Sequence, residues 1–95
     1  MSDQQQGVVL IGNKPIMNYV IACLTLFNSG KQTITIRARG LVIYHAVDAV
    51  ELLRRVFVKD LEVNEITIDS QEFQKNNGFH SSVPMINIVI SKSKK

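Results

Sequence analysis

Two arginines in the segment Arg37-Ala38-Arg39-Gly40 have the chemistry and the spacing needed to bind phosphate groups. Residues 33–39 alternate strictly between polar and apolar side chains, which is the period of a β-strand. Arg37 and Arg39 then share one face about 7 Å apart, close to the separation of neighbouring phosphates on a nucleic-acid strand. Gly40 lets the backbone approach a ligand closely. The alternative is an exposed edge strand that its charges protect from aggregation.

Lys14 lies in a second segment with phosphate-binding chemistry, Gly12-Asn13-Lys14-Pro15. Pro15 is typical of the first turn of a helix. A helix N-terminus attracts anions through its unpaired N–H groups and its dipole, so Lys14 beside it favours a phosphate site. A solvated lysine in an ordinary strand-to-helix turn is the alternative interpretation.

Residues 74–82 form a third, more polar segment that contains Lys75 and His80. Asn76, Asn77 and Gly78 mark a hairpin turn within it. Its amides, hydroxyls, single cation and single aromatic ring suit contacts with a nucleic-acid backbone or minor groove. An ordinary solvated hairpin loop has the same composition.

The elements that must position these segments follow from the hydrophobic pattern. In chain order we predict a strand at 7–12, a helix at about 15–29, a strand at 33–39, a helix at about 42–57, a strand at 61–73 and a strand at 85–91. The continuous apolar run of the first strand is typical of a strand buried on both faces. The alternation in 61–73 changes parity near Asn64 and Glu65, which predicts a β-bulge.

This order, β-α-β-α-β-β, predicts an α+β fold with a four-stranded mixed sheet and both helices on one face. The first two strands are then parallel, so Lys14 and the two arginines meet at the same edge of the sheet. That convergence favours the phosphate-binding interpretation of both segments. The second helix is more apolar than an exposed helix usually is, which favours a homodimer.

Composition limits the remaining classes of function. The 95 residues fit one domain, with 1–6 and 92–95 as expected flexible tails. The net charge of +3 is unevenly spread: residues 1–47 carry +3, 48–91 carry −3, and the C-terminal lysines carry +3.

Cys23 alone cannot form an internal disulfide, and the apolar runs are too short to span a membrane, so we expect a soluble protein of a reducing compartment. Neither His45 nor His80 has metal-ligand spacing or a nucleophile motif nearby, so we expect no metal, no cofactor and no enzymatic activity.

Several segments, read together, identify a resemblance. The chain resembles the Alba family of archaeal chromatin proteins along nearly its whole length, most specifically in V-L-I-G-x-K-P-x-M-N-Y-V and R-A-R-G. The resemblance implies a two-layer β-α-β-α-β-β fold and a homodimer that associates further on DNA. It also implies sequence-independent binding of double-stranded DNA, RNA binding, and a cytoplasmic, nucleoid-associated location.

The resemblance also assigns residues to these roles. Lys14 matches the second lysine of the family's G-K-K-P turn and becomes a candidate for acetylation. Asn13 replaces the first lysine, whose acetylation weakens DNA binding in the family. Arg37, Arg39 and Gly40 match its basic strand end.

Other assignments concern the hairpin and the second helix. Lys75 and His80 lie on the hairpin arms, which in the family reach into the minor groove. Phe57 resembles the aromatic residue of dimer-to-dimer contact, and we place Leu53 with it in the expected oligomer interface.

The chain also departs from the family pattern. It reads R-A-R-G-L-V-I-Y-H-A-V-D where typical members read R-A-R-G-R-A-I-S-K-A-V-D, so Leu41, Tyr44 and His45 leave two cations fewer. We expect a protein that coats, bridges or compacts DNA as a dimer and also binds RNA. The alternatives are an RNA-binding subunit of a ribonucleoprotein and a heterodimer partner of a more basic paralogue.

Overall fold

Two α-helices and four strands follow one another in the predicted order within residues 6–74, 78 and 80–93, which the computed structural model describes. Of Gln6 and His80 only the backbone is described. The elements are β1 (Gln6–Leu10), α1 (Ile16–Asn28), β2 (Thr33–Arg39), the 3-10 turn η2 (Gly40–Val42), α2 (Ile43–Leu52), the π-helical turn η3 (Leu53–Phe57), β3 (Leu61–Gln74) and β4 (His80–Lys92).

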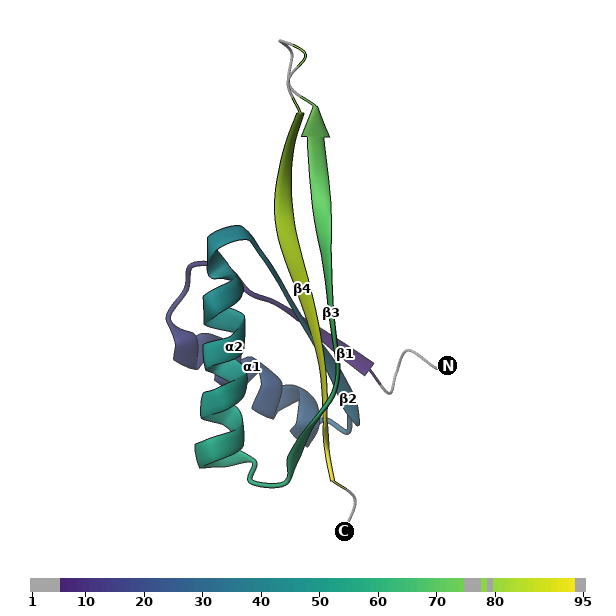
Figure 1. Cartoon of the computed structure of the whole chain (residues 1–95). Coiled ribbons are helices and arrows are strands. Elements are labelled where there is room, and N and C mark those ends of the chain that lie inside the picture. The colour runs from purple at the N-terminus through teal and green to yellow at the C-terminus, as the bar shows by residue number, and fades with distance from the viewer. Residues whose placement is uncertain (1–5, 75–77, 79, 94–95) are drawn as a thin grey trace.

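The strands form one mixed sheet in the order β1-β2-β4-β3, in which β1 runs parallel to β2 and the other pairs are antiparallel. Both helices cover the same face of this sheet (Figure 1). The predicted two-layer α+β fold is therefore confirmed. The alternative of an edge strand at 33–39 is wrong, because β2 lies between β1 and β4.

The core lies between the helices and one face of the sheet. Alternate residues of β2 and β4 point into it, as the alternation predicted, because a strand's side chains have a period of two. The sheet contributes Ile34, Ile36, Ala38, Ile86, Ile88 and Ile90, and the helical segments contribute Tyr19, Val20, Cys23, Phe27, Ala46, Ala49, Val50 and Leu53. Burial raises the pKa of the Cys23 thiol from 9.0 to about 11 because the thiolate loses its hydration.

The prediction that the first strand is buried on both faces is wrong. Val8 and Leu10 are 55% and 66% exposed, whereas Val9 and Ile11 are buried. The two helices cover one face of the sheet, so every second residue of β1 lies on the helix-free face. An all-apolar run hides this alternation.

The predicted helix at 42–57 is present as η2, α2 and η3 in succession. In the last turn the N–H of Val58 donates to the carbonyl oxygen of Leu53 at 2.7 Å, the wider spacing of a π-turn. Leu53 is fully buried and presents no side-chain surface to a partner subunit. Phe57 is 43% exposed and remains available for such a contact.

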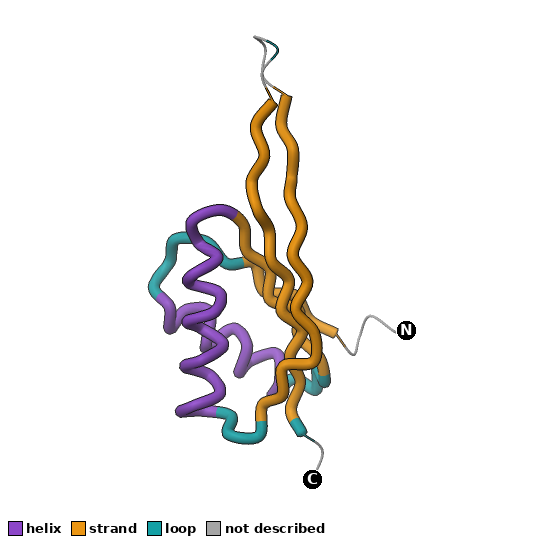
Figure 2. Tube along the Cα trace, in the orientation of Figure 1, coloured by secondary structure: helices purple, strands orange, loops and turns teal. Residues whose placement is uncertain are grey.

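Strands β3 and β4 form a long antiparallel hairpin that extends past the helices (Figure 2). The molecule measures 54 × 31 × 19 Å along its principal axes. The register shifts between Val63 and Glu65, which confirms the predicted bulge. Because of this shift Ile66 and Ile68 pair with Ile88 and Ile86, on the helix side of the sheet.

Candidate nucleic-acid interface

Arg37 and Arg39 project from β2 on the face of the sheet that the helices leave free. Both side chains are exposed. Arg37 donates from Nε to Oδ1 of Asn87 on β4 at 2.8 Å, and Arg39 donates from Nη1 to Oε1 of Gln71 on β3 at 2.7 Å. Among the described residues neither arginine forms an ion pair. The amide acceptors orient the two guanidinium groups and leave their positive charge uncompensated.

The turn that carries Lys14 is held by the hydroxyl of Tyr19. This oxygen accepts hydrogen bonds from the backbone N–H of Gly12 at 2.8 Å and from that of Lys14 at 3.0 Å. Tyr19 is only 7% exposed, so the packed face of α1 anchors the turn. The side chains of Asn13 and Lys14 are exposed at its outer side.

His45 connects the same turn to α2. Its Nδ1 lies 3.4 Å from the carbonyl oxygen of Gly12, a long hydrogen bond in the tautomer that carries the proton on Nδ1. His45 is half-buried, whereas Leu41 and Tyr44 are 98% and 70% exposed. His45 therefore supports the turn, and the other two lie at the surface.

Parallel pairing brings the two basic segments to one end of the sheet, as predicted. Leu10 lies beside Arg37 in the register, and the N–H of Ile11 donates to the carbonyl oxygen of Arg37 at 2.9 Å. Lys14 and the arginines line two different hollows, and Leu10 lines both. The cations thus flank Leu10 from two sides.

Gly40 allows the chain to turn from β2 into η2. Its φ is +66°, in the left-handed region that L-residues with a side chain rarely adopt. A Cβ at this position would also lie 3.4 Å from Cγ1 of Val83 on β4. The structure therefore gives Gly40 a conformational role at the end of the basic strand.

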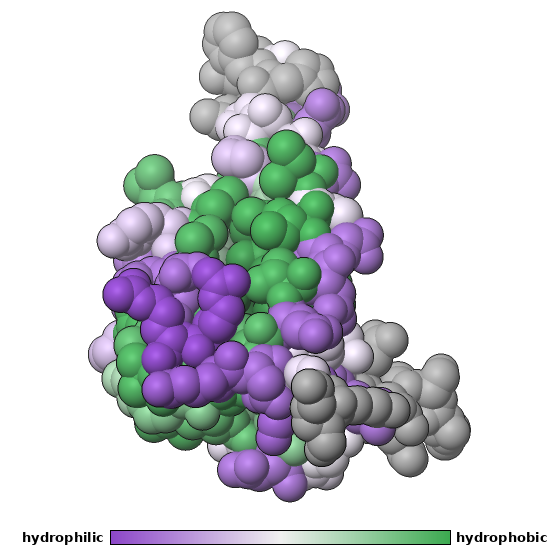
Figure 3. Space-filling view, turned by 60° about the horizontal axis from the view of Figure 1, so that its bottom comes forward, coloured by the Kyte–Doolittle hydropathy of each residue, from purple (hydrophilic) through white to green (hydrophobic). Residues whose placement is uncertain are grey.

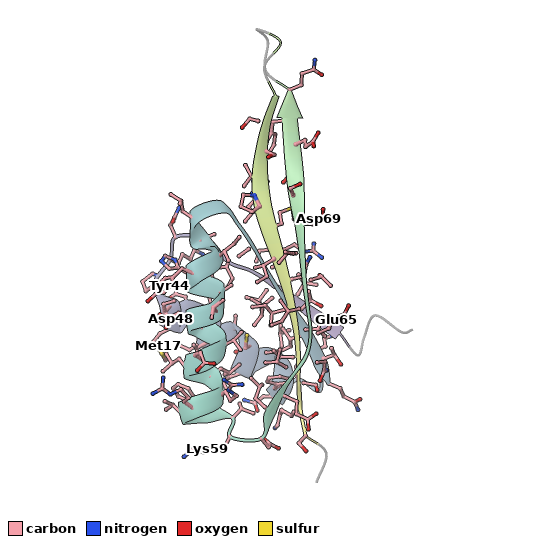
Figure 4. All side chains as sticks on the ribbon, viewed as in Figure 1. Met17, Tyr44, Asp48, Lys59, Glu65 and Asp69 are labelled. Atoms are coloured by element: carbon pink, nitrogen blue, oxygen red, sulfur yellow. The ribbon has the colours of Figure 1, made fainter. Side chains whose placement is uncertain are left out.

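Acidic side chains line the edge strand on the same face. Asp69 lies opposite Met85, which lies opposite Arg39, and Glu65 lies further along the same strand, opposite Val89. Figure 4 shows Glu65 and Asp69 on the side of the hairpin away from the helices. The helix-free face is therefore basic along β2 and acidic along β3.

The remaining predicted site residues belong to the hairpin. Lys75 lies outside the described residues, and His80 pairs with Gln74 through the backbone at the start of β4. The amides that orient the arginines, Asn87 and Gln71, were not among the predicted site residues. The odd-numbered alternation of β4 could have placed Asn87 on the arginine face, but the register was needed to bring either amide into contact.

The described residues contain no helix long and apolar enough to cross a membrane. They also contain no group of three or more His, Cys, Asp or Glu side chains placed to hold a metal ion.

Comparisons with known proteins agree on one family. Residues 7–70 match the family model described as Alba. The chain is 40% identical over 88 residues to the DNA/RNA-binding protein Alba of Methanocella arvoryzae, covering 93% of this chain and 92% of the relative. It is 43% identical over 87 residues to the DNA/RNA-binding protein Alba 1 of Archaeoglobus fulgidus, covering 92% and 97%. These relatives are named as nucleic-acid-binding proteins and not as enzymes.

Solved structures show the same fold. Alba from Thermoplasma volcanium superposes with a TM-score of 0.81 at 40% identity, covering 90% of this chain and 99% of that one. ALBA1 from Trypanosoma brucei gives a TM-score of 0.74 at 25% identity, covering 92% of this chain and 69% of that one. The chain belongs to the Alba family.

Proposed function

We propose that this protein binds double-stranded DNA without reading its sequence, and also binds RNA, through phosphate contacts of Arg37, Arg39 and Lys14. The observation that carries the proposal is the pair of exposed arginines oriented by neutral amides. Guanidinium groups held in this way present fixed donors and full charge to phosphate oxygens. Phosphate contacts fix the position of a protein on nucleic acid and carry no base information.

The protein acts as a dimer, in which a second copy covers an apolar surface between α2 and the hairpin. Ile66 and Ile68 point to the helix side of the sheet but are 57% and 79% exposed, because neither helix extends over them. Val47 on α2 is 45% exposed. Figure 3 displays an area of apolar surface with hydrophilic side chains on both sides of it. Burial of this surface would stabilise association by about 25 cal/mol per Å² before its entropic costs.

Dimerisation doubles the number of basic side chains. The two hairpins, each extending past its own helices, would embrace the duplex from both sides of the dimer. Such a dimer can coat a duplex, and contact between dimers through Phe57 would bridge or compact it. We place it at the nucleoid. A heterodimer with a more basic paralogue would use the same apolar surface.

A salt titration tests the nucleic-acid contacts. Four to eight phosphate contacts per dimer give a slope of log K against log salt of about −4 to −7. Replacement of Arg37 and Arg39 by Ala should weaken binding about equally for unrelated sequences and make the slope shallower. Arg55→Ala is the matched control, because it removes the same charge from exposed η3, about 20 Å along the helix from the arginine edge. An affinity that does not change with salt would overturn the proposal.

Sedimentation tests the dimer. Ile68→Glu places a charge in the apolar surface at a 79% exposed position, so the protomer stays folded and dissociates. Ile21→Glu, at a 54% exposed position on α1, should leave the dimer intact. Sedimentation of the unaltered protein as a monomer at micromolar concentration would contradict the dimer.

A further inference from the structure

A hollow of about 320 Å³ opens beside the two arginines of β2, and its lining takes residues from all four strands. Leu10 and Met85 supply apolar side chains to its lining, and Arg37, Arg39 and Gln71 supply polar ones. We propose that this hollow takes one unpaired base of a single-stranded nucleic acid. The inference rests on the proposed function, since the same arginines hold the flanking phosphates.

The hydrogen bonds of the arginines leave the β1 side of the hollow open. Arg37 bonds toward β4 and Arg39 bonds across β4 to β3, so both side chains lean away from β1. Leu10, the register neighbour of Arg37, remains 66% exposed as a result. The hollow thus combines apolar side chains from β1 and β4 with the two arginines of β2.

These groups match the two chemical parts of a nucleotide. A base has apolar faces that stack on guanidinium planes and on apolar side chains, and its phosphates are anions. The volume of about 320 Å³ is near the lower limit of ordinary small-molecule pockets and has room for one base. Arg37 and Arg39 would therefore contact both the phosphates and the base, and Leu10 would contact the base alone.

A duplex uses the same surface differently. Its bases are stacked inside the helix and reach a protein pocket only after extrusion. Its phosphates contact the arginines from outside and leave Leu10 uncovered. Leu10 is therefore the residue that separates the two binding modes.

The test uses the full chain, a single-stranded oligonucleotide with one 2-aminopurine, and the duplex of the same sequence at one salt concentration. Leu10→Ala should weaken single-strand binding about threefold to tenfold, because apolar contact area is lost, and should change duplex binding less than about twofold. Leu10→Phe should tighten single-strand binding, since it adds a ring on which the base can stack. The change in 2-aminopurine fluorescence should shrink in the first variant and grow in the second.

Val8→Ala is the matched control, because Val8 lies on the same strand and the same face, is 55% exposed, and does not line this hollow. Both Leu10 and Val8 are exposed, so these variants should fold normally. Equal effects of Leu10→Ala on both nucleic acids, or no effect on either, would overturn the inference while Arg37→Ala still weakened both. If the unaltered protein bound neither nucleic acid, the proposed function and the inference would both fail.

Discussion

Arg39 on β2 reaches across β4 and donates a hydrogen bond from Nη1 to Oε1 of Gln71 on β3, at 2.7 Å. Arg37 makes the equivalent bond to Asn87 on the neighbouring strand. An amide at these positions holds the guanidinium group in place and leaves its charge for a ligand. A carboxylate would hold it equally well and neutralise it.

Replacement of the Gln71 amide by a carboxylate should therefore weaken nucleic-acid binding more than removal of the amide does. In Gln71→Glu the new carboxylate pairs with Arg39, and we expect affinity for duplex to fall on the order of tenfold. The slope of log K against log salt should become shallower by about 2 per dimer, one phosphate contact for each protomer. Gln71→Ala should leave the slope unchanged and weaken binding less, because the charge remains. Fluorescence anisotropy over a salt series measures both quantities.

Gln32→Glu provides the control for net charge, since Gln32 is exposed just before β2, at the opposite end from Arg39. It should change the slope much less than Gln71→Glu. Identical slopes for the two glutamate variants would show that overall charge, and not the contact with Arg39, determines binding.

The acidic edge of the same face should weaken nucleic-acid binding. The backbone of Asp69 is two strands from that of Arg39 in the register, about 10 Å, and a unit charge at that distance from a bound phosphate contributes about 0.4 kcal/mol in water. Asp69→Asn should therefore raise affinity about twofold at low salt, and the gain should disappear at high salt because ions screen it. Asp48→Asn removes an equal charge from α2 and should have a smaller effect. A decrease in affinity on removal of Asp69 would contradict this electrostatic account.

The hydroxyl of Tyr19 should matter for stability and for the position of Lys14. Tyr19→Phe removes the acceptor of two backbone N–H groups, and we expect the free energy of unfolding to fall by about 1–2 kcal/mol. Urea denaturation measures this loss, and binding assays should show a weaker affinity because the turn is no longer fixed. Tyr44→Phe is the control, since that ring is 70% exposed. Equal stability of the two variants would show that water replaces the hydroxyl at no cost.

Sequence periodicity was sufficient to predict the fold because most elements bury one side only. The alternation of 33–39 placed both arginines on one face, and the change of parity near Asn64 located the bulge. Periodicity failed for β1, where exposed Val8 and Leu10 are as apolar as their buried neighbours. A pattern of apolar and polar residues cannot reveal a face that carries no polar side chain.

The side chains that accept hydrogen bonds from the two arginines are determined by the strand register, which the local sequence pattern does not reveal. Arg37 and Asn87 are 50 residues apart, and Arg39 and Gln71 are 32 apart. A slip of β4 by two residues would keep its isoleucines on the inward face while moving Asn87 away from Arg37. The register, including its shift between Val63 and Glu65, is therefore known only from the pairings in the folded chain.

The buried thiol of Cys23 should make stability fall at alkaline pH. Its pKa is raised from 9.0 to about 11 by burial, so the folded state retains a proton that the unfolded state releases above pH 9. The protonated thiol therefore adds to the free energy of unfolding below pH 9, by at most about 3 kcal/mol. This stabilisation is lost as the pH rises from 9 to about 11. Urea denaturation at several pH values should show a smaller alkaline loss in Cys23→Ala than in the unaltered chain, even though the variant is less stable at neutral pH because it leaves a cavity. Parallel pH profiles for the two proteins would show that the thiol does not contribute.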